Sequence, residues 1–305
     1  MNKITEKLLE IVSGWQGEFH GAFNIRENGQ CAGRQSSPHI QIDSKEDAPG
    51  LVIHISPEAQ QETVFIPACV THGNVDDLVY NDFYVGAGAN VTIVAGCGVH
   101  TDTEETARHN GIHRFFLEKG AHVRYLEKHI GTGVGGGLKT IDPVTDAQIG
   151  EDATLEMDTV QLGGVDSTVR KTAAVLAARA KLTIHESILT DGEETAKTEF
   201  RVSMDGEDCG ADLISRSVAK GNSRQEYHSR ILGNSRCTGH SECDAILVDH
   251  GTVNASPELY AGNIDAMLIH EAAIGKIAGE QIIKLCTLGL TEKQAEEKII
   301  EGFLR

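Results

Sequence analysis

A short alternating pattern that returns about every thirty residues constrains the fold of this 305-residue chain most strongly. An alanine followed two positions later by an aliphatic residue recurs at 89/91, 121/123, 153/155, 180/182 and 211/213. The alternation extends one step further in the first four copies, whereas the fifth copy breaks off at Ser215. Such alternation is typical of strands with one buried face. A period within about 20–50 residues indicates a stacked architecture.

Strands, not helices, build each repeat, because no helical stripe intervenes between the copies. This argues against strand-helix-strand units and leucine-rich repeats, and it favours a parallel β-helix whose rungs stack with small residues at the corners. Segments 51–55, 63–66 and 79–85 also read as strands. No proline occurs from 144 to 256, so ladders there can run uninterrupted. A β-sandwich or barrel is the alternative.

Helices are predicted at both ends of the chain. Residues 3–15 carry one apolar helical stripe, and a polar, irregular stretch follows to residue 49. Near the other end, a helix over 281–286 ends at Gly289, and Thr291 with Gln294 forms a capping box for a second helix. We therefore expect three parts: a helix and lead-in over 1–49, a β-helix core over 50–269 and a helical docking segment over 270–305.

The composition limits the classes of partner. With 45 acidic residues against 27 Lys and Arg, the net charge is -18, which disfavours nucleic acids and anionic lipid. No apolar run has the length of a membrane helix, and the first residues lack the features of a signal peptide. The expected location is the cytoplasm. Seven cysteines in such a chain argue against a disulfide framework.

A glycine-rich segment, Gly131–Gly136, matches the G-x-G-x-x-G dinucleotide fingerprint. That motif requires a helix at its third glycine, and the following residues show no helical stripe and include Pro143. We expect a mobile loop here instead of a nucleotide site. Any dependence on ATP would then come from another chain.

The spacing Cys237-x-x-His240-x-x-Cys243 suggests metal ligands, but on a straight strand the two cysteines share one face and His240 lies on the other. The roles of Cys237 and His240 are therefore left open. The pair His270-Glu271 lies downstream, and a thiolate, an imidazole and a carboxylate joined across rungs would suit iron, zinc or an iron–sulfur cluster. No hydrolytic motif or catalytic carboxylate pair is evident, which weighs against a carbohydrate-cleaving β-helix enzyme.

Several C-terminal segments together resemble the SufB/SufD family: 215–221, 243–248, 270–277, 288–291 and 302–304. The resemblance implies a right-handed parallel β-helix with a C-terminal helical domain that binds SufC, an ABC-type ATPase. It also implies a scaffold, not an enzyme, that assembles iron–sulfur clusters with sulfur from a cysteine desulfurase or another donor. Such a scaffold passes the clusters to apo-proteins, and ATP hydrolysis belongs to the partner chain.

Matched to the family residue by residue, Cys243 corresponds to the SufB cysteine that holds nascent sulfur or cluster, and His270 and Glu271 correspond to its His-Glu pair. This ligand set is SufB-like, and a SufD-like adaptor without a cluster is the alternative. No cysteine occurs at 172–175, where the family's sulfur-receiving cysteine should align, so the entry route for sulfur is open. The short chain suggests a homodimer that fills both roles, in place of a SufB–SufD heterodimer.

Overall fold

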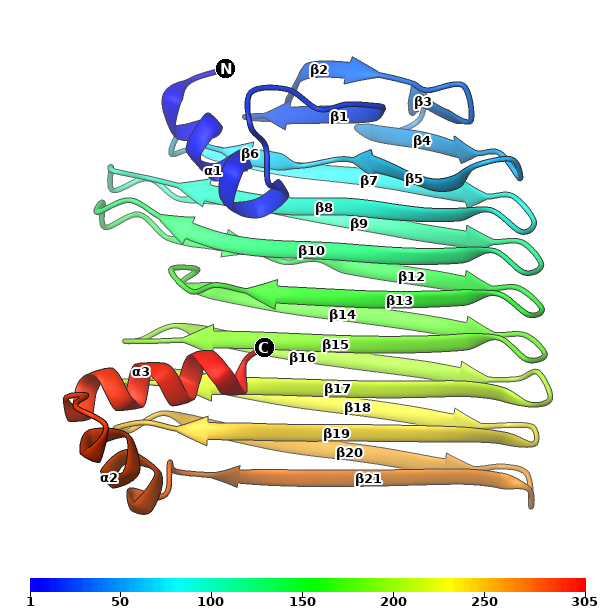
Figure 1. The fold of residues 1–305 in the computed structure, drawn as a ribbon. Coiled ribbons are helices and arrows are strands. Elements are labelled where there is room, and N and C mark those ends of the chain that lie inside the picture. Colours follow the sequence, from blue (N-terminus) through cyan, green and yellow to red (C-terminus); the bar gives the residue numbers. More distant parts are fainter.

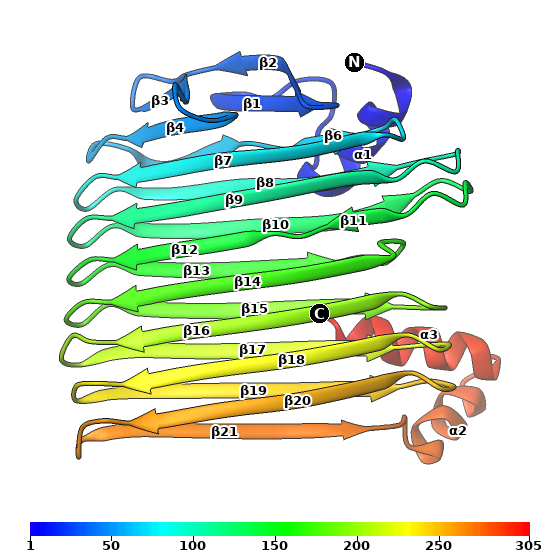
Figure 2. The same ribbon diagram turned by 180° about the vertical axis from the view of Figure 1, so that it is seen from behind.

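The computed structural model describes residues 1–305 and confirms a mainly β protein, a parallel β-solenoid of about eight turns (Figures 1 and 2). Two long sheets face each other, and successive strands of the solenoid alternate between them. Sheet A contains β1 (Ala22–Glu27), β2 (Gln30–Gln35), β5 (Gln60–Phe65), β6 (Ala68–Val70), β8 (Asn90–His100), β10 (His122–Thr132), β13 (Thr154–Gln161), β15 (Lys181–Thr190), β17 (Cys209–Ala219), β19 (Cys237–Leu247) and β21 (Ala266–Gly275). Sheet B contains β3 (Ile40–Ser44), β4 (Gly50–Ile55), β7 (Val75–Val85), β9 (Ala107–Leu117), β11 (Lys139–Ile141), β12 (Val144–Ile149), β14 (Ser167–Leu176), β16 (Thr195–Met204), β18 (Arg224–Gly233) and β20 (Thr252–Ala261).

Small residues mark the corner that precedes each strand of sheet A. Ala89, Ala121, Ala153 and Ala180 are all buried, and each N–H closes a tight turn by donating to the carbonyl three residues earlier. The fifth predicted copy is displaced by two positions, because Ala211 pairs with Leu182 and not with the corner. Cysteines occupy the corner position in the next two rungs. Along the column of stacked corner residues, Cys209 follows Ala180, and Cys237 follows Cys209 in register. Because the repeat was defined by alanine, it missed cysteine as a second small residue at the same corner.

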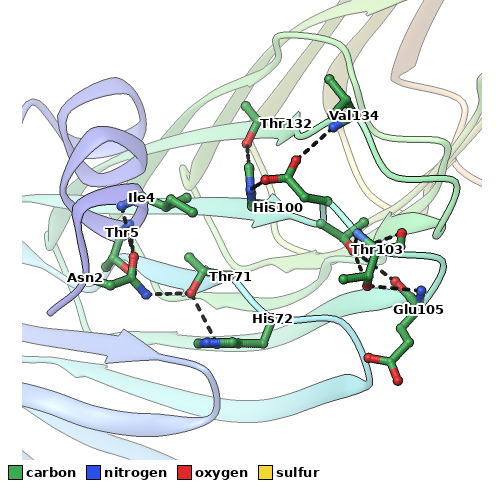
Figure 3. A network of polar contacts seen from close by, with 12 residues as sticks. Asn2, Ile4, Thr5, Thr71, His72, His100, Thr103, Glu105, Thr132 and Val134 are labelled. Atoms are coloured by element: carbon green, nitrogen blue, oxygen red, sulfur yellow. Dashed lines mark hydrogen bonds and ion pairs between the residues drawn. The ribbon is translucent and has the colours of Figure 1, made fainter.

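The first helix, α1 (Lys3–Ser13), covers the outer face of sheet A at β8. Asn2 caps it by accepting hydrogen bonds from two backbone N–H groups, and its amide donates to Thr71 Oγ1 at 2.8 Å (Figure 3). Glycines in β8 allow the close approach, since a Cβ on Gly96 would lie 2.4 Å from the Val12 carbonyl oxygen. The predicted N-terminal helix is confirmed.

The stretch from 16 to 49 is not irregular as expected, because it contains β1, β2 and β3. β1 and β2 form an antiparallel hairpin, and β3 pairs antiparallel with β4. The hairpin turn is Asn28-Gly29, with φ of 48° and 79°, which is a typical two-residue turn signal. The alternation is hard to read in this region because β2 contains no buried residue. These pairings close the first end of the solenoid.

The glycine-rich segment after β10 forms a loop, and no helix begins there. It is held against the loop of the preceding rung, since Gly135 and Gly137 donate backbone hydrogen bonds to the Thr101 and Thr103 carbonyls at 3.2 and 2.9 Å. Asp102 Oδ1 also accepts from the Val134 N–H at 3.0 Å, close to the contact between His100 and Thr132 (Figure 3). A Cβ on Gly135 would lie 2.2 Å from the Thr103 carbonyl oxygen. The glycines therefore serve close packing of two loops, and the nucleotide fingerprint has no structural counterpart.

Two helices follow the last strand, α2 (Gly279–Thr287) and α3 (Glu292–Phe303). The capping box of Thr291 and Gln294 is present, as predicted. The expected boundary at 270 is too early, because β21 continues to Gly275. α3 returns over sheet A, where Ser187 Oγ donates to the Leu304 carbonyl at 2.9 Å (Figure 1). None of the three helices combines the length and the apolar character that crossing a bilayer requires.

Candidate functional site

The predicted ligands lie on the last two strands of sheet A, where alternation decides which way each side chain points. Along β19, Ser241 and Cys243 are buried and face the interior. On β21, His270 is the register partner of Ser241, and Ala272 is the partner of Cys243. His270 therefore shares the inner face with Cys243, two residues before the direct partner of Cys243, and Glu271 points to the outer face.

Cys243 is a buried thiol, 1% exposed, in the apolar core. Burial raises its pKa to about 12, and the negative charge of Glu186 adds to this shift. Between them on the intervening strand lies Ser215, which is the register partner of both and donates to Glu186 Oε2 at 2.8 Å. The thiol is protonated at neutral pH, so binding a metal there must displace its proton.

His270 has a buried ring nitrogen, Nδ1, with no hydrogen-bond partner. A buried polar atom without a partner is costly, and a ligand supplied from outside the chain would remove that cost. β21 and β20 are the terminal strands of the two sheets, so this end of the solenoid is open (Figures 1 and 2). Cys243 and His270 thus lie just inside an uncovered rim.

Glu271 lies on the other side of sheet A, with its side chain 69% exposed. Its carboxylate is 3.9 Å from His240 Nε2. Ligand atoms of His240, Glu242 and Glu271 all lie within 4.8 Å of one another. Within one chain the structure therefore brings Cys243 and His270 to one face and Glu271 to the opposite face.

The Cys237-x-x-His240-x-x-Cys243 motif lies on a strand, and its members separate as alternation predicts. Cys237 is a buried corner residue of the core, while His240 lies on the outer face. His240 Nδ1 is 2.7 Å from Asp212 Oδ1 on β17. Sequence reasoning missed Asp212 and Glu242. The i, i+2 spacing of His240 and Glu242 was the available signal, because it places both on one face of a strand.

A band of polar side chains lies inside the solenoid, and no pattern in the sequence predicts it. Arg170 on β14 reaches across the interior to Glu127 on β10 at 2.6 Å and lies 3.4 Å from Glu186 on β15. Burial raises the pKa of Glu186, while the Arg170 charge opposes that shift. Arg170 is 43 positions from Glu127 and 16 from Glu186, so only the stacking of rungs reveals the cluster. In sheet A the band reaches Ser215, which is directly next to Cys243 in the ladder, and buried Ser241 lies one strand further, beside His270.

Comparison with known proteins gives this site its context. Residues 79–303 match the family model described as SUF system FeS cluster assembly, SufBD core domain. Proteins named iron-sulfur cluster assembly SufBD family protein are 29% identical in Methanothermobacter thermautotrophicus, over 84% of this chain and 62% of the relative, and in Archaeoglobus fulgidus, over 85% and 69%. One from Methanocaldococcus jannaschii is 24% identical over 77% of this chain and 74% of the relative. The chain thus spans about three fifths of the length of the Methanothermobacter relative. It belongs to the SufBD family of iron–sulfur cluster assembly proteins.

Proposed function

We propose that this chain is the SufB-like scaffold on which an iron–sulfur cluster is assembled and then released. The observation that carries the proposal is the placement of Cys243 and His270 on the same inner face of sheet A, where the buried Nδ1 of His270 has no partner, at the open end of a SufBD-family solenoid. Cys243 supplies a thiolate and His270 a nitrogen ligand. Glu271 joins them across a dimer interface, where one chain's carboxylate approaches the cysteine of its partner.

This mixture of ligands suits transfer. A soft thiolate combined with nitrogen and oxygen ligands holds iron, and clusters accept such mixed ligation. A carboxylate dissociates more easily than a second thiolate, so the cluster can leave for an apo-protein. The protein acts here as a scaffold, and a partner chain supplies the energy of ATP hydrolysis.

A homodimer across the open end is the second part of the proposal. β20 and β21 carry unpaired backbone edges, which proteins rarely leave uncovered. Large apolar side chains are also exposed on these strands and on the turn between them: Leu259, Tyr260, Ile264, Met267, Ile269 and Ile274. A second copy would cover both features and bring two Cys243 residues to one interface.

The C-terminal helices are proposed to bind a SufC-like ABC ATPase in the cytoplasm. α2 contains no buried residue, although its hydrophobic side chains lie on one side. Ile283 is 64% exposed and Leu288, directly after the helix, is 75% exposed. The rest of the chain does not cover these side chains, so they can form an apolar contact with a partner protein. Sulfur would come from a cysteine desulfurase or another donor.

A SufD-like adaptor that anchors the ATPase is the second candidate. The separation of Glu271 from Cys243 by sheet A favours it, because one chain alone does not assemble the predicted ligand set. An adaptor would bind the ATPase and acquire no chromophore when supplied with iron and sulfide.

Anaerobic reconstitution with iron and sulfide tests the proposal, with visible absorption and iron and sulfide analysis as the measurements. We expect a chromophore in the wild type and its loss in Cys243→Ala. Cys237→Ala is a matched control, because it is buried on the same face of the same strand and occupies a column that alanine fills elsewhere. If Cys243→Ala assembles as much cluster as the wild type, the assignment of Cys243 is wrong. If the wild type acquires none but retains the ATPase, the adaptor is correct.

A further inference from the structure

A second group of metal-ligating side chains lies on the outer face of sheet A, behind Cys243. His240 and Glu242 come from β19 and Glu271 from β21, and their ligand atoms lie within 4.8 Å of one another. Glu242 and Glu271 are direct register partners. The group is half-open to solvent, since the His240 side chain is 30% exposed and that of Glu271 69%.

The histidine is oriented by a fourth residue. Asp212 on β17 lies 2.7 Å from His240 Nδ1. Because an ionised carboxylate only accepts hydrogen bonds, Nδ1 carries the proton and donates it to Asp212. In the neutral ring this tautomer leaves the lone pair on Nε2, which is the atom 3.9 Å from Glu271. Metal-binding histidines are typically held in this way, with the second nitrogen donating to a carboxylate.

The charges here are not balanced by the protein. None of Asp212, Glu242 and Glu271 forms an ion pair with Lys or Arg; Asp212 and Glu271 lie within 4.0 Å of His240 nitrogens, and Glu242 has no such partner. Asp158, on the same outer face, does have a cationic partner, Arg124 at 3.0 Å. Like charges directly opposite on neighbouring strands repel each other, so Glu242 and Glu271 destabilise the pairing of β19 with β21. A bound cation would relieve that repulsion.

We propose that His240, Glu242 and Glu271 bind a divalent first-row transition-metal ion, with Asp212 as the positioning residue. One imidazole nitrogen and two carboxylate oxygens suit iron(II), manganese or zinc better than the all-oxygen sites of magnesium and calcium. Three protein ligands on the outer, solvent-facing side of sheet A leave coordination positions for water, so the ion can exchange. The identification of the natural ion as iron(II) rests on the proposed function, whereas binding of a divalent ion does not.

The position of the group suggests its use. Glu242 precedes Cys243 directly, so β19 presents the thiol on one face and the cation group on the other. Glu271 belongs to both this group and the cluster ligands proposed above. An iron(II) ion held here would therefore lie at the rim where the cluster is built. Binding involves no change of oxidation state.

Anaerobic titration of the full chain with cobalt(II), without sulfide, tests the site. We expect one ion per chain with visible d–d absorption, and a weakening of at least about tenfold in His240→Ala and Glu242→Gln. Asp212→Asn should weaken binding by about 10–100-fold, as for other residues that orient a metal ligand. His185→Ala is the matched control: His185 lies on the same outer face 3.3 Å from Asp158, outside the group of three ligands. This control should bind cobalt as the wild type does.

The result that overturns the site is absence of a bound ion in the wild type, or equal affinity in wild type and His240→Ala. A thiolate-to-cobalt charge-transfer band in place of the d–d spectrum would also overturn it, because the ion would then be on a cysteine. Circular dichroism verifies that each variant is folded. If the wild type builds clusters but binds no cobalt at His240, this inference is wrong and the scaffold function stands. If the wild type binds cobalt there but builds no cluster, the scaffold function is wrong and the metal site stands.

Discussion

At the scale of single residues, the thiol of Cys243 is governed by its burial and by a carboxylate two strands away in the same ladder. Burial raises its pKa to about 12, and the charge of Glu186 contributes to that shift. Glu186→Gln removes the charge, so we expect a larger thiolate fraction and about threefold faster alkylation at pH 9, which corresponds to half a pKa unit. Mass spectrometry of each cysteine peptide measures the rates. Exposed Cys31 is the internal reference, and a proportional change at both cysteines would contradict the prediction.

The sequence proposes candidate site residues, but it does not place all of them on a face of the sheet. Alternation within a strand is readable, so the opposite orientations of His240 and Cys243 could be predicted. The relation between Cys243 and Glu271 depends on the register between two rungs, in which Cys243 pairs with Ala272. Loop length sets that register, and a shift of one residue moves a side chain to the other face.

At the scale of elements, the packing of α1 on β8 depends on glycine. A Cβ at position 96 would lie 2.4 Å from the Val12 carbonyl oxygen, so Gly96→Ala must displace the helix. We expect a loss of about 1–3 kcal/mol in the free energy of unfolding, as for other overpacked sites, measured by urea denaturation. Gly302→Ala is the control: this glycine lies within α3 with no atom near a Cβ, and alanine should stabilise by up to about 1 kcal/mol. Equal effects of the two variants would show that α1 does not pack tightly.

At the scale of the whole molecule, the repeat predicted the stacking of strands, and the structure confirms it. The two ends differ in a way that the repeat could not reveal. Antiparallel strands close the first end, where the Asn28-Gly29 turn was the available but unread signal. The last strands are paired on one side only. A repeat describes what each rung shares with its neighbours, so it carries no information on how the series stops.

The polar band inside the solenoid gives global stability a pH dependence. His113 on β9 is buried, with Nδ1 2.7 Å from Tyr125 Oη and Nε2 3.2 Å from the Asn81 amide. Desolvation lowers its pKa from 6.5 to about 4. The unfolded chain therefore binds a proton between these values that the folded chain does not, and stability falls as pH decreases through that window. The contribution is complete above pH 6.5 and on the order of 3 kcal/mol is lost by pH 4.

Urea denaturation at pH 7.5, 6, 5 and 4 measures this loss, and His113→Gln should flatten the profile. The variant should retain part of the slope, because burial also lowers the pKa of His129 in the same band. His185→Gln serves as the control, since this histidine is exposed on the outside of sheet A and its removal should leave the slope unchanged. Parallel profiles for wild type and His113→Gln would mean that folding does not lower the pKa of His113. That outcome would require a charged neighbour to compensate for burial, with Glu127 as the carboxylate in position to do so.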